Sequence, residues 1–145
     1  MSFHYLEKSI FIRAPAVEAW NALTTPDIAR LFFLSCEIIS DWKVGSSLHF
    51  DTEVDGEMRT VIKGEITEIS PRQHLVYTCF IPDQEQDPTQ HIVVSFRFSE
   101  VEGGTEVFVT QGPFSNEDEK KRNEDSSETI LNGMKVVIEN QSGNR

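Results

Sequence analysis

The chain has 145 residues, of which 38% are hydrophobic and 26% charged, a composition that suits one globular domain over residues 1–145 with a single core. Its formal net charge of −11 disfavours nucleic acid and anionic membranes as partners, because the longest basic run, Lys120–Arg122, is flanked by acidic residues. We interpret that run as a solvated helix face.

The start of the chain lacks a basic leader followed by an apolar run, so no signal peptide is expected. No apolar stretch approaches the roughly 18 residues that a membrane-spanning helix needs. We therefore expect a cytoplasmic protein that does not enter the membrane. In that compartment Cys36 and Cys79, which lie in apolar strand-like segments, should stay reduced and pack in the core.

The first predicted elements are a strand and two short helices. Polar and apolar residues alternate over residues 3–13, which indicates an amphipathic strand. Pro15 suits the first turn of a helix, and an apolar stripe at helical spacing follows it to Thr24. Pro26 favours the start of a second short helix, which we expect to continue to Phe32.

Six further strands follow, separated by turn signals. Alternation predicts them at residues 36–42, 48–54, 59–69, 74–81, 92–99 and 107–111. Asp55-Gly56 is a strong hairpin signal, and residues 82–90, polar and with two prolines, must form a loop. Gly64 lies inside a strand and suggests a bulge or a sharp bend, whereas Gly112-Pro113 is expected to end the sheet.

The last thirty residues predict a long helix. Ser115 is a suitable N-cap, and the acidic residues that follow it complement the helix dipole. Over residues 127–140 one apolar stripe is formed by Ile130, Leu131, Met134, Val137 and Ile138. A single amphipathic helix after a run of strands must bury this stripe against the face of their sheet.

In this order, the elements resemble the helix-grip fold of the START-like and Bet v 1-like (SRPBCC) superfamily. Residues 12–27, 44–45, 64–71, 75–78, 104–110 and 130–135 are similar to the bacterial branch of the heat-shock-protein-90 ATPase-activator-like family. The resemblance implies an α+β fold: a curved antiparallel sheet of about seven strands, two short helices and a long C-terminal helix. It implies little about activity, because these stretches mostly describe turns and core.

The chain departs from the family pattern at three places. Phe32 and Phe33 stand where the family often has paired tryptophans, Cys79 where it often has an aromatic residue, and Ser127 where it usually has a tryptophan. The small residues at two interior positions would enlarge a cavity unless their neighbours fill the space. Gly133, in the middle of the helix, either lets the helix approach the sheet closely or is simply tolerated.

Motifs that would carry catalysis or bind a cofactor are absent from the sequence. The histidines are scattered, and His49, Asp51 and Glu53 share a strand face that alternation directs outward, so we expect no metal site. No glycine-rich phosphate loop or nucleophile elbow occurs. Cys79 and Tyr77 could face the interior, but no base or cation accompanies the thiol, which we interpret as inert. We expect no catalytic residue and no cofactor.

The space between the long helix and the sheet is the expected ligand site, because helix-grip folds hold a cavity there. Thr52 and Gln111 are the candidate polar anchors, and each apolar candidate can equally be plain core. The candidate ligand-contacting residues are Phe32, Phe33, Phe50, Thr52, Tyr77, Cys79, Phe96, Phe98, Gln111, Ile130, Leu131 and Met134.

The expected function is binding of a small hydrophobic or aromatic molecule with polar ends. One alternative is an enzyme that acts on a hydrophobic substrate in the same cavity, which would need a polar pair with a perturbed pKa. The other is a chaperone-associated interaction module, which only the family resemblance implies. The oligomeric state is left open, a homodimer included.

Overall fold

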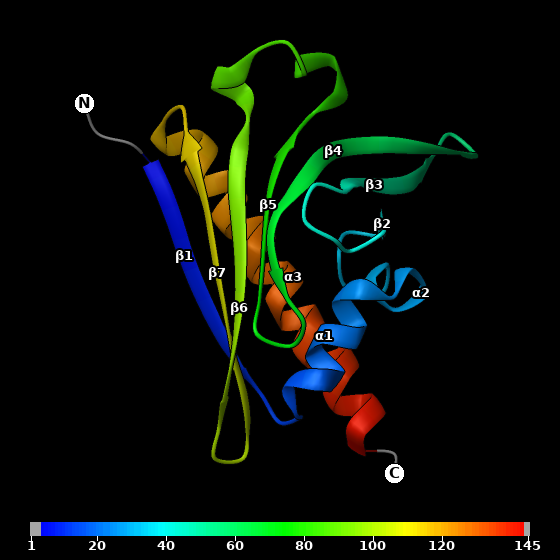
Figure 1. The fold of residues 1–145 in the computed structure, drawn as a ribbon, viewed down its shortest axis with the longest axis vertical. Helices are drawn as coiled ribbons and strands as arrows, with labels where there is room; N and C mark the ends of the chain where they lie inside the picture. Colours follow the sequence, from blue (N-terminus) through cyan, green and yellow to red (C-terminus); the bar gives the residue numbers. More distant parts are fainter. Residues whose placement is uncertain (1–3, 144–145) are drawn as a thin grey trace.

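The computed structural model describes residues 4–143; residue 3 of the predicted first strand and residues 144–145 at the end of the chain lie outside them. A curved antiparallel sheet of seven strands carries the long helix α3 across one face, and two short helices lie at one end (Figure 1). The elements are β1 (His4–Ile12), α1 (Ala16–Thr24), α2 (Pro26–Ala29), β2 (Glu37–Ser40), β3 (Ser47–Val54), β4 (Glu57–Ser70), β5 (His74–Phe80), β6 (Ile92–Val101), β7 (Gly104–Phe114) and α3 (Glu117–Gly143), with 3-10 turns η1 (Pro82–Gln84) and η2 (Pro88–Gln90).

The strand order is β1-β7-β6-β5-β4-β3-β2, so strands that follow one another pair throughout, except that β1 joins β7. The helices α1 and α2 therefore connect the two opposite edges of the sheet. This arrangement confirms the expected α+β helix-grip fold. No helix among residues 4–143 is long and apolar enough to span a membrane.

Strand β4 gives the sheet its curvature. Its 14 residues pair first with β3 and then with β5, and the register shifts on either side of Gly64, between Thr60 and Ile62 and again between Ile66 and Glu68. A Cβ atom at Gly64 would overlap the carbonyl oxygen of Thr78, so the neighbouring strand requires glycine there. The predicted bend is confirmed, with the irregularities beside Gly64 rather than at it.

The prediction that Gly112-Pro113 ends the sheet was wrong. Strand β7 continues to Phe114, which pairs with His4, and Gly112 pairs with Val93. Opposite β1 the register shifts at this point, so Pro113 lies in an irregularity where the ladder does not need its missing N–H.

The second short helix and the cap of the long helix also differ from expectation. Helix α2 ends at Ala29 rather than at Phe32, and the turn after it places Leu34 and Ser35 at φ values of 52° and 63°, outside the helical region. The predicted cap Ser115 was wrong by one residue: the side-chain oxygen of Asn116 accepts the N–H of Glu119 at 2.8 Å.

Helix α3 has two different halves. From Ser127 onward its stripe is in the core, with Ile130, Leu131, Met134 and Ile138 buried and Val137 partly buried, as predicted. From Glu117 to Ser126 every side chain is exposed or half-buried. Gly133 meets the segment after α2 rather than the sheet, because a Cβ atom there would lie 3.0 Å from the Cβ of Phe32.

Candidate functional site

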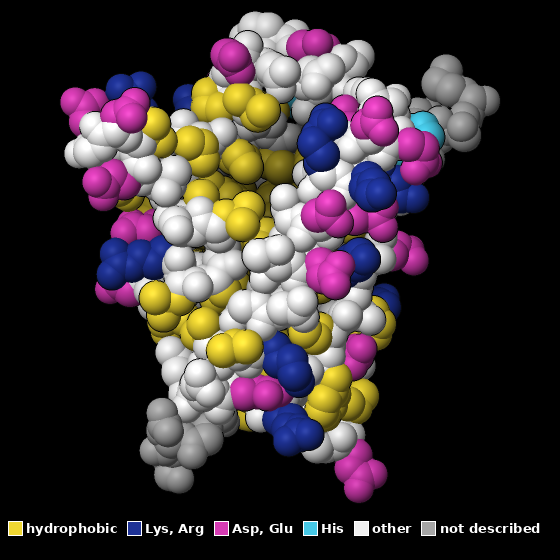
Figure 2. All heavy atoms as spheres, turned by 180° about the vertical axis from the view of Figure 1, so that it is seen from behind, with side chains coloured by type: hydrophobic (Ala, Val, Ile, Leu, Met, Phe, Trp, Pro, Cys, Tyr) yellow, Lys and Arg dark blue, Asp and Glu magenta, His cyan; other side chains and the backbone are white. Residues whose placement is uncertain are grey.

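The polar half of α3 leaves part of the sheet uncovered. Its first turns offer no apolar stripe, so they cannot pack on the inner face of β4, β5 and β6 as the second half packs elsewhere. A pocket of about 400 Å³ opens between them. Figure 2 shows a hollow with hydrophobic walls below the segment of residues 81–91 at the top of the view.

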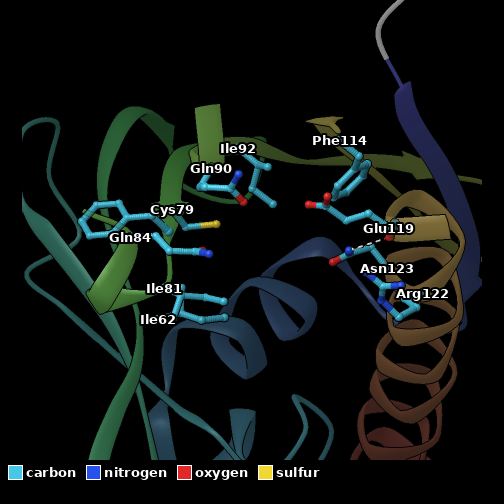
Figure 3. Close-up of a pocket in the computed structure, with 11 residues that line it drawn as sticks. Ile62, Cys79, Ile81, Gln84, Gln90, Ile92, Phe114, Glu119, Arg122 and Asn123 are labelled. Atoms are coloured by element: carbon cyan, nitrogen blue, oxygen red, sulfur yellow. Dashed lines mark hydrogen bonds between the residues drawn. The ribbon is translucent and has the colours of Figure 1, made fainter. Parts of the chain in front are cut away.

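One wall of the pocket is apolar and the other is polar. Ile62, Cys79 and Ile92 project from three adjacent strands, and Ile81 and Phe114 extend this wall at its edges (Figure 3). The polar groups come from two other places. The segment after β5 contributes the amides of Gln84 and Gln90, and α3 contributes Glu119, Arg122 and Asn123.

The segment that closes the pocket above β5 is a loop, as predicted, but it is internally braced. The carboxylate of Asp87 accepts the backbone N–H of Thr89 at 3.0 Å and its hydroxyl at 2.6 Å. These bonds lower the pKa of Asp87, so its charged form holds the turn. His91 stacks on Phe80 with ring centroids 4.5 Å apart, and its Nε2 lies 3.0 Å from the carbonyl oxygen of Glu85.

The wall formed by α3 is ordered by its own backbone. Asn123 donates from its side-chain nitrogen to the carbonyl oxygen of Glu119 at 2.8 Å, one turn earlier in the helix. This bond directs the oxygen of the Asn123 amide toward the pocket (Figure 3). The pocket therefore presents polar groups of α3 on one side, and on the other an apolar strand surface with the amides of Gln84 and Gln90 beside it.

The structure brings the predicted site residues together on the inner face, but mostly as packed core. All except Thr52 and Gln111 are buried, and the hydroxyl of Thr52 donates to the carbonyl oxygen of Ser35 at 2.9 Å. Phe33 and Phe50 pack with ring centroids 5.2 Å apart, and Phe50 and Tyr77 at 6.0 Å. Their role in ligand binding stays a prediction.

The small residues at the two interior positions have different consequences. Ser127, buried at 2% exposure, borders a void of only about 10 Å³ with Phe33, Phe96, Gln111, Ile130 and Leu131. That space is about the minimum for one water molecule. Neighbours therefore fill the volume at Ser127. Cys79, in contrast, is the one predicted site residue that also lines the 400 Å³ pocket.

Sequence reasoning missed most of the residues around the open pocket. It assigned Arg122 to a solvated helix face and Glu119 to the acids that complement the helix dipole, and it gave no role to Gln84, Gln90 or Asn123. The signal that could have found them is the absence of an apolar stripe in residues 117–126. A helix half without a stripe stands off the sheet and leaves strand residues such as Ile92 uncovered.

Two titratable groups of the inner face, Cys79 and Tyr77, are held uncharged. Burial raises the pKa of the Cys79 thiol to about 12 and the pKa of Tyr77 well above its ordinary value. A thiol with such a pKa supplies almost no thiolate at neutral pH, which agrees with its interpretation as inert. The face of His49 is on the outside, where its Nδ1 lies 3.1 Å from Asp51. Within residues 4–143 no group of three His, Cys, Asp or Glu residues is placed to hold a metal ion.

Solved structures similar to this chain share its fold. ChR145 from Cytophaga hutchinsonii is 31% identical over 99% of both chains, with a TM-score of 0.82. MLL2253 from Mesorhizobium loti is 19% identical, with 94% of this chain and 98% of that chain covered and a TM-score of 0.73. For Ara h 8.0201 the identity is 13%, the coverage 94% and 98%, and the TM-score 0.69. No curated protein matches in sequence.

The sequence profile of a family matches most of the chain. The family is described as "Activator of Hsp90 ATPase homolog 1-like protein", and the match covers residues 13–139. The solved structures that are less than 25% identical support a shared fold alone. The family profile and ChR145 also show similarity in sequence. The chain therefore belongs to the Activator of Hsp90 ATPase homolog 1-like family, and its seven-stranded sheet and long C-terminal helix form a helix-grip fold.

Proposed function

We propose that this protein binds a small molecule with a hydrophobic or aromatic body and polar ends. The observation that carries the proposal is the pocket of about 400 Å³ between the sheet, residues 81–91 and the first half of α3. Small-molecule sites are usually concavities of roughly 300–1,000 Å³, with apolar walls and a few placed polar groups. The pocket has both properties.

The body of the ligand would cover the strand residues that α3 leaves open. Ile62, Cys79 and Ile92 form a continuous apolar wall, and burial of such a surface contributes about 25 cal/mol per Å². The amides of Gln84 and Gln90, which lie beside Cys79 and Ile92, and the polar side chains of α3 across the pocket would hold its polar ends. This division of the pocket explains why the ligand needs two chemically different ends.

The enzyme alternative gains no support from the pocket. Acid–base catalysis needs a titratable pair with perturbed pKa values, and Cys79, whose raised pKa of about 12 keeps the thiol neutral, does not supply a working acid or base. The chaperone-associated alternative rests on the family resemblance alone.

The test is a thermal-shift screen of aromatic and alicyclic compounds, followed by two-dimensional amide NMR with each compound that raises the melting temperature. A ligand that binds only the folded state adds about 2.7 kcal/mol of stability at one hundred times its dissociation constant. We expect the amide shifts to map to residues 79–92 and 114–123. Shifts confined to the outer face of the sheet, or a screen without a single stabilising compound, would contradict the proposal.

A further inference from the structure

The carboxylate of Glu119 is free to meet a ligand. Glu119 is the third residue of α3, and its N–H bonds to the cap Asn116 at 2.8 Å. In a capping box the acidic side chain at this position turns back to the N–H of the cap residue. Here the side chain lines the pocket instead, and among residues 4–143 its carboxylate makes no hydrogen bond or ion pair.

The direction of the side chain separates Glu119 from the other charge in the wall. Figure 3 shows its carboxylate beside Phe114, pointing across the pocket toward Gln90 and Ile92. Arg122 is exposed and lies against the flank of the helix in the same view. The negative group is therefore the one that faces the apolar wall, in surroundings where a charge is less screened than at the surface.

The neighbouring groups favour a hydrogen-bond donor with a positive charge. A protonated primary amine carries three N–H donors. Glu119 can accept one in a charge-assisted bond, and the amide oxygens of Gln90 and Asn123 lie on the same pocket. The net charge of −11 also attracts cations over long range. The helix dipole does not reverse this preference, because Glu117, Asp118 and Glu119 already offset it.

We propose that Glu119 makes this pocket selective for amphipathic amines, molecules with an apolar or aromatic body and a protonated primary amine. The body lies on Ile62, Cys79 and Ile92, and the ammonium group lies at the α3 wall. This inference rests on the proposed small-molecule function and assigns the chemical class of its ligand.

The experiment uses three probes with one aromatic body and different ends: naphthylethylamine, naphthylethanol and naphthylacetate. Dissociation constants are measured by amide NMR titration at neutral pH with the wild type, Glu119→Gln and Asp118→Asn. Asp118→Asn is the matched control, because it removes one negative charge from the same helical turn and so changes the net charge and the compensation of the helix dipole equally. Asp118 itself is exposed and does not line the pocket. A denaturant titration and the amide spectrum verify that each variant is folded.

We expect the amine to bind most tightly and the carboxylate most weakly. Glu119→Gln should weaken amine binding about 10-fold or more, the usual effect of losing a charge-assisted bond, and leave the alcohol unchanged. Asp118→Asn should leave the ratio of amine to alcohol unchanged. If the alcohol or the carboxylate binds at least as tightly as the amine, the proposed selectivity is wrong, although the pocket still binds small molecules. An equal effect of Glu119→Gln and Asp118→Asn on amine binding would contradict the selectivity in the same way. If none of the three shifts residues around the pocket, the proposed function itself is contradicted.

Discussion

Cys79 determines how much of the pocket is empty. Its side chain is small, buried and directed at the pocket from the end of β5. Cys79→Phe should place an aromatic ring in the space that the body of a ligand would occupy. We expect thermal shifts caused by naphthyl compounds to be lost, with a dissociation constant weakened about 10-fold or more, because the apolar wall is already covered. Isothermal titration calorimetry measures this change.

Cys79→Ala is the matched control, because it keeps the pocket open and removes only the thiol. It should retain binding within about twofold. Loss of binding in Cys79→Ala as strong as in Cys79→Phe would show that the thiol, rather than the volume, matters. Unchanged binding in Cys79→Phe would place the ligand elsewhere and count against the pocket.

Met134 shows the difference between a residue that faces the interior and one that lines an open site. It was predicted to contact a ligand, but its side chain is fully buried, at 0% exposure, in the packed half of α3. Met134→Ala should therefore destabilise the fold by about 2–5 kcal/mol, the usual range for removing such a side chain from a core. Val136→Ala, on the exposed side of the same helix at 58%, should change stability by less than about 0.5 kcal/mol.

Urea denaturation of both variants measures this difference, with ligand titrations on the folded proteins. If Met134→Ala costs no more than Val136→Ala, the packing at this position is looser than the structure indicates. If it instead weakens ligand binding while stability holds, Met134 belongs to the site after all.

At the scale of elements, α3 covers the free edge of β1 with a pair of charged side chains. Lys135 donates to the carbonyl oxygen of Phe11 at 2.6 Å and to Glu139 at 2.7 Å, and Glu139 accepts the N–H of Arg13 at 2.8 Å. An edge strand otherwise presents such groups unpaired. The bond from Lys135, and then that from Arg13, lowers the pKa of Glu139 below its ordinary value of 4.5.

This pair makes stability depend on pH in a defined direction. Because the pKa of Glu139 is lowered on folding, its contribution is fully present above the ordinary value of 4.5 and is lost as the pH falls through the lowered pKa. Glu139→Gln should therefore have a lower free energy of unfolding than the wild type at neutral pH. This gap in the free energy of unfolding should narrow in acid. Glu128→Gln, whose loose pair with Lys8 spans 3.9 Å, is the control and should show no gap. A gap for Glu139→Gln that stays constant across pH would contradict this account.

The elements that alternation and helical spacing define were predictable, and the irregular ones were not. Seven strands and the stripe from Ile130 to Ile138 follow from periodicity, which reports burial directly. The continuation of β7 past Pro113 depends on a register shift against β1, a contact far away in sequence. The same holds for Gly133, whose neighbour Phe32 is set by how α2 ends. Such positions are decided by tertiary packing, which a local pattern does not contain.

For the whole molecule, the site was harder to predict than the fold for a related reason. Alternation identifies residues that point inward, but it does not separate those that meet a partner from those that meet empty space. Phe96 and Leu131 border a void of only about 10 Å³, so they meet packed neighbours. Cys79 and Ile92, in contrast, line the open pocket of about 400 Å³. The difference depends on where α3 stops packing on the sheet, and only the arrangement of both layers reveals it.

The division of the space between α3 and the sheet into a packed part and an open part predicts how the whole molecule responds to a ligand. The first half of α3 and residues 82–90 bury no side chain, so their amide hydrogens should exchange fastest among the helical segments of the free protein. A bound ligand bridges these two segments and should slow their exchange. The second half of α3 and strand β7 are already packed and should change little.

Hydrogen exchange followed by mass spectrometry, with and without naphthylethylamine, measures this response. Cys79→Phe with and without the compound is the control, because the filled pocket should abolish the ligand-dependent protection. Protection that rises evenly over the whole chain would indicate global stabilisation rather than closure of one site. Protection that rises in residues 127–139 but not in 82–90 would place the ligand in the packed half, at the residues that alternation alone selects. The pattern of protection therefore distinguishes the open pocket from the core beside it.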